Sequence, residues 1–458
     1  MVEPMESTKF HFASALTEAG WRDGVTVAVD AAGMISSLAM GTQEGLHIKG
    51  IAIPAVPNVH SHAHQRLMLG LAERAGPGVD SFWTWREAMY GFALRLTPED
   101  LQAVAAQAYV EMLKSGFSVV GEFHYLHHQP DGTPYGNPAE MSLSCLAAAE
   151  EAGIAMTMLP TLYAYGGFGG QAPVAGQRRF INGSGSFMNI YEALVREAKG
   201  HSLCRVGISP HSLRAVTPEL LATVIDGIDS LSSIHIHVAE QMQEVDDCLA
   251  FSGQRPVEML LDSFALSGRW TAIHATHMTA EETRRLAQSH AIAGLCPATE
   301  ANLGDGIFPA VDFLRAQGAI AIGSDSHISI SPAEDMRMLE YSQRLRDRTR
   351  NALAAGPGQS TGRSLLEAVC RGGATSIAQP VGVLAPGFRA DIMVLDSEHP
   401  SLIGRGEDAA LDTWIFSGGN LLVKDVLVAG RHVVKDRHHH HEEAIARRFA
   451  TAVRRLSA

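Results

Sequence analysis

Several histidines follow short apolar stretches of the sequence at a spacing that suits metal binding. His60 and His62 lie two residues apart in PNVHSHAHQR, and His235 and His237 have the same spacing in SIHIHVAEQ. On an extended strand, residues two apart project from the same face, so each pair could offer two imidazoles to one ion. A single pair can equally be two ordinary, partly buried histidines, so other groups must decide between these interpretations.

Further imidazole and acidic groups end other apolar stretches. Glu240 comes just after the stretch that contains His237, His274 lies in TAIHATH, and Asp325 lies in AIGSDSH. If these stretches are parallel strands, all of these groups lie where strands end, which is where such folds build their sites. Unrelated buried histidines would have no reason to share that position, so the four places together predict a metal site.

Eight apolar runs alternate with helical segments along the chain, and these elements must position the residues above. The runs cover residues 51–56, 118–123, 154–159, 204–209, 233–238, 271–276, 291–296 and 319–324. This alternation is typical of a parallel sheet, and eight runs predict an α/β fold of the (β/α)8 TIM-barrel type. A doubly wound open sheet is the alternative. Neither GxGxxG after the first run nor GxxxxGK[ST] occurs, so nothing supports a phosphate-binding loop.

Both ends of the chain have a β-rich texture. Residues 8–50 alternate apolar and polar side chains, and similar stretches return at 390–396, 413–418 and 426–436. We therefore expect residues 1–50 and 376–440 to form one small β-sandwich-like domain beside a catalytic barrel of residues 51–375. Residues 441–458 have the spacing of an amphipathic C-terminal helix. The glycine-rich stretch 166–188 predicts a long loop, of the kind that often serves as a lid or binding loop.

Composition excludes several classes of protein. The 458 residues include 36 Lys plus Arg and 49 Asp plus Glu, which gives a formal net charge of −13. A chain this acidic, without a basic block, is not expected to bind nucleic acid or a membrane surface. No apolar run is long enough to span a bilayer. Five scattered cysteines and a start without a secretory signal favour the reducing cytoplasm.

The motifs PNVHSHAH, HIHVAEQ, HATH and GSDSH, followed by APGFRADIMVLD (385–396), resemble in this order those of the amidohydrolase superfamily of metal-dependent deaminases and hydrolases. The resemblance implies that one metal ion has four ligands: His60, His62, His237 and Asp325. It also implies that His274 and Asp325 orient a metal-bound water and that Glu240 moves protons.

Zinc is the metal expected for this ligand set. Three imidazoles and a carboxylate suit Zn²⁺ and leave a coordination position for water, although the ligand types also allow iron. Members of the superfamily with two metals usually carry a bridging lysine after the fourth strand. CRVGISPHSLR has no lysine, so we expect one ion per subunit.

Other segments resemble one family within this superfamily, the formimidoylglutamate deiminases, which hydrolyse N-formimino-L-glutamate to N-formyl-L-glutamate and ammonia in histidine degradation. These segments are HQRLMLGLAER, FWTWREAMY, GEFHYLHH and SPHSLRAV. The resemblance implies five substrate contacts: Gln65, Arg86, Tyr125, His211 and Arg214. His64 departs from the family, which more usually has an aromatic residue there, and we interpret it as a packing variation.

The expected partner is therefore a small dicarboxylate substrate, for which the planar guanidinium groups of Arg86 and Arg214 are suited. A ring deaminase of the same superfamily, acting on a purine, pyrimidine or triazine, is one alternative, but a flat ring would favour a stacking pocket over two arginines. A catalytically dead barrel that acts as a binding protein is another, but such relatives typically lose ligands that this chain retains. We also expect a homo-oligomer, taken as a dimer.

Overall fold

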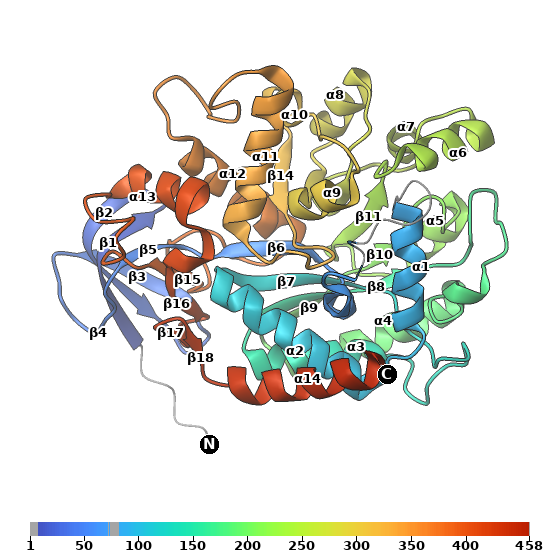
Figure 1. The fold of residues 1–458 in the computed structure, drawn as a ribbon, viewed down its shortest axis with the longest axis horizontal. Helices are drawn as coiled ribbons and strands as arrows, with labels where there is room; N and C mark the ends of the chain where they lie inside the picture. Colours follow the sequence, from blue (N-terminus) through green and yellow to red (C-terminus); the bar gives the residue numbers. More distant parts are fainter. Residues whose placement is uncertain (1–7, 72, 74–81, 458) are drawn as a thin grey trace.

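The computed structural model describes residues 8–71, 73 and 82–457. Short parallel strands lie at the centre of the molecule, with helices around them (Figure 1). These strands are β6 (Val56–Ser61), β7 (Phe117–His124), β8 (Ala155–Leu162), β9 (Cys204–Val206), β10 (Ser209–Pro210), β11 (Ile234–Val238), β12 (Trp270–His274), β13 (Ile292–Leu295) and β14 (Ala319–Ile322). Most of their residues are buried, which explains why they read in the sequence as continuous apolar runs.

The parallel strands form two groups that approach each other on both sides. One sheet has the order β10-β8-β7-β6, with β9 also paired to β8, and the other has the order β11-β12-β13-β14. Isolated parallel bridges join Ser61 to Asp325 and Ile208 to Ile234. The ends of β6 and β14 are thereby brought together, and these are the strand ends that carry the first and last of the expected metal ligands.

A separate, mixed sheet of nine strands combines both ends of the chain, with the order β18-β17-β16-β15-β5-β1-β2-β3 and β4 paired to β1. Its strands are β1 (Thr8–Thr17), β2 (Gly20–Val29), β3 (Ile35–Met40), β4 (Leu46–His47), β5 (Ile51–Pro54), β15 (Ile392–Leu395), β16 (Val423–Val428), β17 (Arg431–Lys435) and β18 (His438–His439). The sheet buries an apolar cluster of its own, which includes Phe12, Val27 and Ile392.

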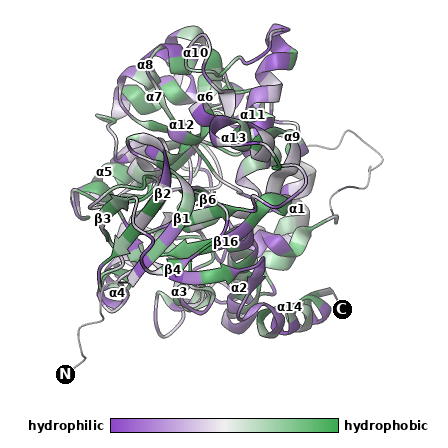
Figure 2. Ribbon diagram, turned by 90° about the vertical axis from the view of Figure 1, so that its left-hand side faces the viewer, coloured by the Kyte–Doolittle hydropathy of each residue, from purple (hydrophilic) through white to green (hydrophobic). Residues whose placement is uncertain are grey.

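The helices cover the parallel strands on their outer side (Figure 1). They are α1 (Phe82–Ala93), α2 (Pro98–Ser115), α3 (Glu140–Ala152), α4 (Ser184–Ala198), α5 (Pro218–Asp226), α6 (Met242–Ser252), α7 (Pro256–Ser263), α8 (Ala280–Gln288), α9 (Pro297–Leu303), α10 (Ala310–Arg315), α11 (Pro332–Asp347), α12 (Thr361–Ser376), α13 (Glu407–Thr413) and α14 (Glu442–Ser457). Hydrophobic residues concentrate on the central strands, whereas the outer helix α14 alternates hydrophilic and hydrophobic residues (Figure 2). Among the helices of the described residues, none is long and apolar enough to cross a membrane.

Local sequence explains where the helices begin and end. Helix α2, for example, follows a capping box in which the Thr97 side chain accepts from the amide of Asp100, and Pro98 occupies its first position. It ends at Gly116, whose φ of 104° suits glycine. A side chain at this position would meet the sulfur of Met393, so the same residue allows close packing against the mixed sheet.

The structure differs from the expected elements at four places. The expected run 204–209 is divided into two short strands, Cys204–Val206 and Ser209–Pro210. The first apolar run, 51–56, is divided, because Ile51–Pro54 pairs with β1 and β15 in the mixed sheet and Val56 begins the first parallel strand. Residues 413–418 are not a strand: α13 continues into a wider helical turn over Trp414–Gly418. Short buried apolar runs look alike in strands and helices. The glycine-rich loop ends at Gly183, where α4 begins.

Candidate active site

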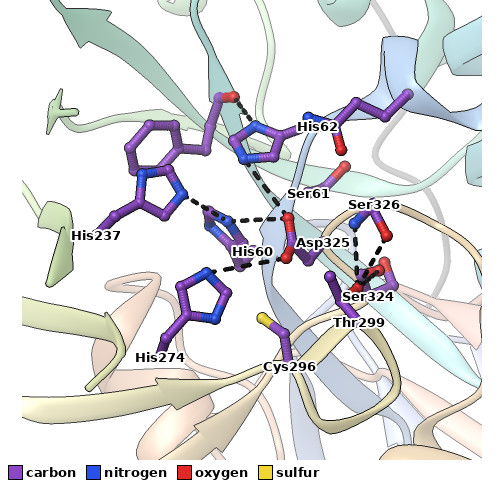
Figure 3. A network of polar contacts seen from close by, with 12 residues as sticks. His60, Ser61, His62, His237, His274, Cys296, Thr299, Ser324, Asp325 and Ser326 are labelled. Carbon is purple, nitrogen blue, oxygen red and sulfur yellow. Dashed lines mark hydrogen bonds and ion pairs between the residues drawn. The ribbon is translucent and has the colours of Figure 1, made fainter. Parts of the chain in front are cut away.

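Four side chains from distant parts of the chain converge at the carboxyl ends of the parallel strands (Figure 3). The His60 Nε2 atom lies 3.1 Å from His237 Nε2 and 3.4 Å from Asp325 Oδ1. The His62 Nε2 atom lies 3.6 Å from the same Asp325 oxygen. All four side chains are buried. The ligand atoms of His60, His62 and His237 lie close enough together for one metal ion, and Asp325 lies in an adjoining group with His60 and His274.

The imidazoles are held with their Nε2 atoms facing the centre of this group. The Nδ1 atom of His62 donates to the Phe123 carbonyl at 2.7 Å, and that of His237 donates to the His211 carbonyl at 2.9 Å. A carbonyl oxygen only accepts, so these contacts place the proton on Nδ1 and leave the Nε2 lone pair for an ion. Burial first, and neighbouring imidazoles second, hold the pKa of His60 and His237 well below the ordinary value. The residues therefore fit a metal ion, because neutral nitrogens and one carboxylate are the donors it needs.

His274 lies at the edge of this group among three carboxylates. Its Nε2 atom is 3.7 Å from Glu240 Oε1 and 3.9 Å from Asp325 Oδ2, and its Nδ1 atom is 3.1 Å from Glu300 Oε1. Burial acts to lower the pKa of His274, but Glu240, Glu300 and Asp325 outweigh it and raise the pKa to about 10. Burial raises the pKa of Glu240 to about 7 despite the nearby His274. The site thus holds groups that can exchange protons near neutral pH.

Several residues at the same strand ends have a left-handed backbone, a conformation that also occurs elsewhere in the described chain. Outside glycine, left-handed φ angles occur at Ala239 (52°), His274 (67°), Asp325 (45°) and His327 (61°). Residues other than glycine rarely adopt such angles. A left-handed backbone at these residues persists where the surrounding structure imposes it. Gly323 adds a close approach, because a Cβ atom there would lie 2.7 Å from the Cβ of His60.

A buried chain of hydrogen bonds connects the residues next to His60 and His62. Asn58 donates to the Ser324 hydroxyl at 2.7 Å, which lies 3.0 Å from His327 Nδ1, and His327 Nε2 lies 3.1 Å from the Ser61 hydroxyl. Ser61 in turn donates to Glu122 at 2.5 Å. Because Ser61 lies between His60 and His62, these hydrogen bonds tie the end of β6 to β7 and to the loop after β14.

A cavity opens from the ligand group toward α1 and the loop after β8. It is lined by all five expected substrate contacts, Gln65, Arg86, Tyr125, His211 and Arg214, and by His62, His237, Glu240, His274 and Asp325. His60, the remaining expected residue, is fully buried beneath it. The structure therefore brings every site residue expected from the sequence into one place.

Polar contacts order the side of the cavity next to the ligands. Gln65 donates to the Tyr125 hydroxyl at 2.9 Å, and His64 Nε2 lies 2.9 Å from the same oxygen. His64 belongs to none of the residue groups that could hold a metal among the described residues. Its contact is with Tyr125, which agrees with a packing role.

Sequence reasoning missed several residues of the site. Glu300, which contacts His274 and also accepts from the amide of Cys296, lies 26 residues further along the chain than His274. Tyr90, Tyr163 and Phe180 line the cavity as well. The only local signal was a tyrosine a few residues after a predicted strand, as at Tyr163 after residues 154–159. Tyrosine is common at such positions without a function.

The chain belongs to the amidohydrolase family, whose profile residues 51–433 match. It is 50% identical over 447 residues to the formimidoylglutamate deiminase of Pseudomonas aeruginosa, an alignment that covers 96% of this chain and 98% of that protein. The crystal structure of an amidohydrolase from Brucella melitensis is 46% identical and superposes with a TM-score of 0.93, covering 98% of this chain and 100% of that one. An adenosine deaminase from Xanthomonas campestris, crystallised with bound zinc, is 19% identical with a TM-score of 0.82 over 98% of each chain, and so shares the fold.

Proposed function

We propose that this protein is a formimidoylglutamate deiminase, which hydrolyses N-formimino-L-glutamate to N-formyl-L-glutamate and ammonia in histidine degradation. The observation that carries the proposal is the presence of two arginines, Arg86 and Arg214, in the same cavity as the group of metal-ligand type. The extensive identity to the Pseudomonas aeruginosa enzyme supports it further.

The metal of the proposed site is one zinc ion, held by His60, His62, His237 and Asp325. When bound, zinc supplies a Lewis acid that makes a coordinated water acidic enough to react at neutral pH. The proposal is supported by the inward-facing Nε2 atoms and by the single carboxylate, a donor set that suits zinc. The same donors accept iron, so metal analysis of the purified protein decides between the two.

The chain's own residues divide the proton transfers of the reaction. Asp325 and His274, whose Oδ2 and Nε2 atoms lie 3.9 Å apart, orient the attacking water, and Asp325 takes its proton. Oxygen adds to the formimino carbon, and the bond from that carbon to the terminal nitrogen breaks. Glu240 accepts a hydrogen bond from the N–H of that nitrogen. It then donates the proton with which the nitrogen leaves as ammonia. Because the pKa of Glu240 is about 7, this side chain can both accept and donate that proton.

The five expected substrate contacts, Gln65, Arg86, Tyr125, His211 and Arg214, bind and orient the substrate. A dianionic substrate is repelled by a protein of net charge −13 unless local positive charge compensates. Arg86 and Arg214 supply this charge with a planar fork that matches a carboxylate. Gln65, Tyr125 and His211 add hydrogen bonds between the arginines and the proposed metal.

The finer architecture is also part of the proposal. The parallel strands close into a (β/α)8 barrel, which is supported by the bridges between Ser61 and Asp325 and between Ile208 and Ile234. The expected division gives residues 1–50 and 376–440 to a small β domain, 51–375 to the barrel and 441–458 to the C-terminal helix. Because Ile51–Pro54 pairs in the mixed sheet, the small domain extends to residue 54, and residues 1–7 lie outside the described part of the chain. The protein works as a homo-oligomer, a dimer, in the cytoplasm. Five buried cysteines without disulfide bonds agree with a reducing compartment.

An ammonia-release assay tests the proposed function. The purified, metal-loaded protein is supplied with N-formimino-L-glutamate and, in parallel, with N-formimino-L-aspartate, guanine and cytosine. We expect release from formimino-glutamate at a kcat/KM at least a hundredfold above that for any other compound. Preferential release from a ring compound would overturn the proposal in favour of a ring deaminase. Well under one metal ion per chain with no release from any compound would favour a catalytically dead binding protein.

A further inference from the structure

Tyr163 follows directly after β8 and lines the cavity on the side of Arg214. Its side chain is 3% exposed. The amide of Asn182 donates to its carbonyl at 2.8 Å. The ring packs edge-on against His211, with 4.5 Å between centroids, and lies 5.8 Å from the ring of Phe180. The position of the hydroxyl is therefore determined by the surrounding structure.

The hydroxyl of Tyr163 accepts a hydrogen bond from a neighbour whose orientation is itself determined. Gln177, which is 1% exposed, uses its Oε1 atom to accept from the amide of Val174 at 2.8 Å. This contact identifies which end of the side-chain amide is nitrogen. The Nε2 atom then donates to the Tyr163 oxygen at 2.7 Å. An amide nitrogen only donates, so the Tyr163 oxygen is the acceptor and must direct its own proton elsewhere.

The hydroxyl proton of Tyr163 is available to a group in the cavity. Within the part of the chain that the structure describes, the bond from Gln177 is the one hydrogen bond to this hydroxyl. The positive charge of Arg214 is close by: burial lowers the pKa of Arg214, but Tyr163 and then Glu244 outweigh it and raise the pKa. A tyrosine O–H beside a guanidinium presents two donors to one anion.

We infer that Tyr163 is a further substrate-binding residue, which donates its hydroxyl proton to the substrate carboxylate that Arg214 binds, and that Gln177 positions it. This inference rests on the proposed function, because it requires a dicarboxylate in the cavity. The pair of donors explains selectivity for a carboxylate over an amide. A carboxylate has one oxygen for each of the two donors, the Tyr163 hydroxyl and the Arg214 guanidinium. A substrate amide has one oxygen and one NH2 group, so its N–H hydrogens would face one of these donors.

The test compares Tyr163→Phe with the wild type and with Tyr191→Phe as a matched control. Tyr191 is another buried tyrosine, and its hydroxyl bonds to Ser232 and Asp229 away from the cavity. Three substrates are used: N-formimino-L-glutamate, N-formimino-L-glutamine, which lacks the distal carboxylate, and N-formimino-4-aminobutyrate, which lacks the α-carboxylate. Steady-state kinetics and the thermal midpoint are measured for each variant.

We expect Tyr163→Phe to raise KM for formimino-glutamate roughly ten- to a hundredfold, the range of a charge-assisted hydrogen bond, with kcat within threefold of the wild type. The effect should vanish on one mono-carboxylate substrate, the same one on which Arg214→Met has no effect. Tyr191→Phe should lower the thermal midpoint and leave KM unchanged. Gln177→Met should raise KM in the wild type but not in the Tyr163→Phe background, because it acts through that hydroxyl.

Three results would overturn the inference while the proposed function stands. One is a KM for Tyr163→Phe within twofold of the wild type, and another is an equal loss on all three substrates. The third is an additive effect of Gln177→Met in the Tyr163→Phe background, because Gln177 would then act on the fold. A wild-type protein that releases no ammonia from formimino-glutamate refutes the proposed function, and the inference fails with it.

Discussion

Replacing Glu240 by glutamine removes a charge and a proton acceptor while it keeps the shape of the side chain. Glu240 lines the cavity, its side chain is 12% exposed, and its Oε1 atom lies 3.7 Å from His274 Nε2. At about this separation, opposite charges near a protein surface interact by about 4 kcal/mol, which is about a thousandfold in rate. General acid–base catalysis contributes a similar factor, roughly 10²–10⁴. We therefore expect Glu240→Gln to lower kcat by roughly 10²–10⁴.

Metal content separates this role from metal binding. Glu240 is outside the proposed ligand set, so the variant should retain as much zinc as the wild type. The assay follows ammonia release under saturating substrate, with zinc measured on the same preparation. Asp247→Asn, an exposed change of the same charge on α6, serves as the control and should keep normal turnover. Loss of zinc in proportion to turnover in Glu240→Gln would refute the reasoning and place Glu240 in the metal site.

Three further changes test other parts of the site. Asp325→Asn removes a ligand charge and a proton acceptor together, and should lower kcat by several orders of magnitude; near-normal turnover would contradict the proposed site. Arg86→Met and Arg214→Met should each lower kcat/KM for formimino-glutamate roughly ten- to a hundredfold. Lysine at either position should not fully restore kcat/KM. For each mono-carboxylate substrate, only one of the two methionine variants should lower kcat/KM. Burial raises the pKa of Glu122 to about 7, so the folded state binds this proton more tightly than the unfolded state and loses stability as pH rises from about 4.5 to 7. Glu122→Gln should weaken that dependence in urea unfolding at pH 5 and 8, and an unchanged pH dependence would contradict the assignment.

The sequence by itself was enough to predict that these histidines and Asp325 come together and that the fold is α/β with parallel strands. His60 and His62 point the same way because β6 is extended, and the two-residue period of a strand is a local property. His237, His274 and Asp325 each follow an apolar run, and parallel strands bring their carboxyl ends to one side of a sheet. The five expected substrate contacts came from a resemblance in short motifs, and they line one cavity.

Other features depended on which segments pair, and local sequence carries little information about pairing. Ile51–Pro54 looks like the start of a barrel strand, but it pairs with β15 from nearly 350 residues further along the chain. Trp414–Gly418 has the apolar texture of a strand, yet it continues a helix because burial alone does not distinguish the two.

The polar partners of the site were decided only by the tertiary structure. Glu300 contacts His274, Glu122 contacts Ser61, and Gln177 contacts Tyr163, each across two elements that the sequence separates. A hydrogen bond requires its two atoms within about 3 Å and in line, and that condition is met only after the strands have packed. Ligand types can therefore be recognised from residue spacing, whereas the groups that orient them become visible only in the folded chain.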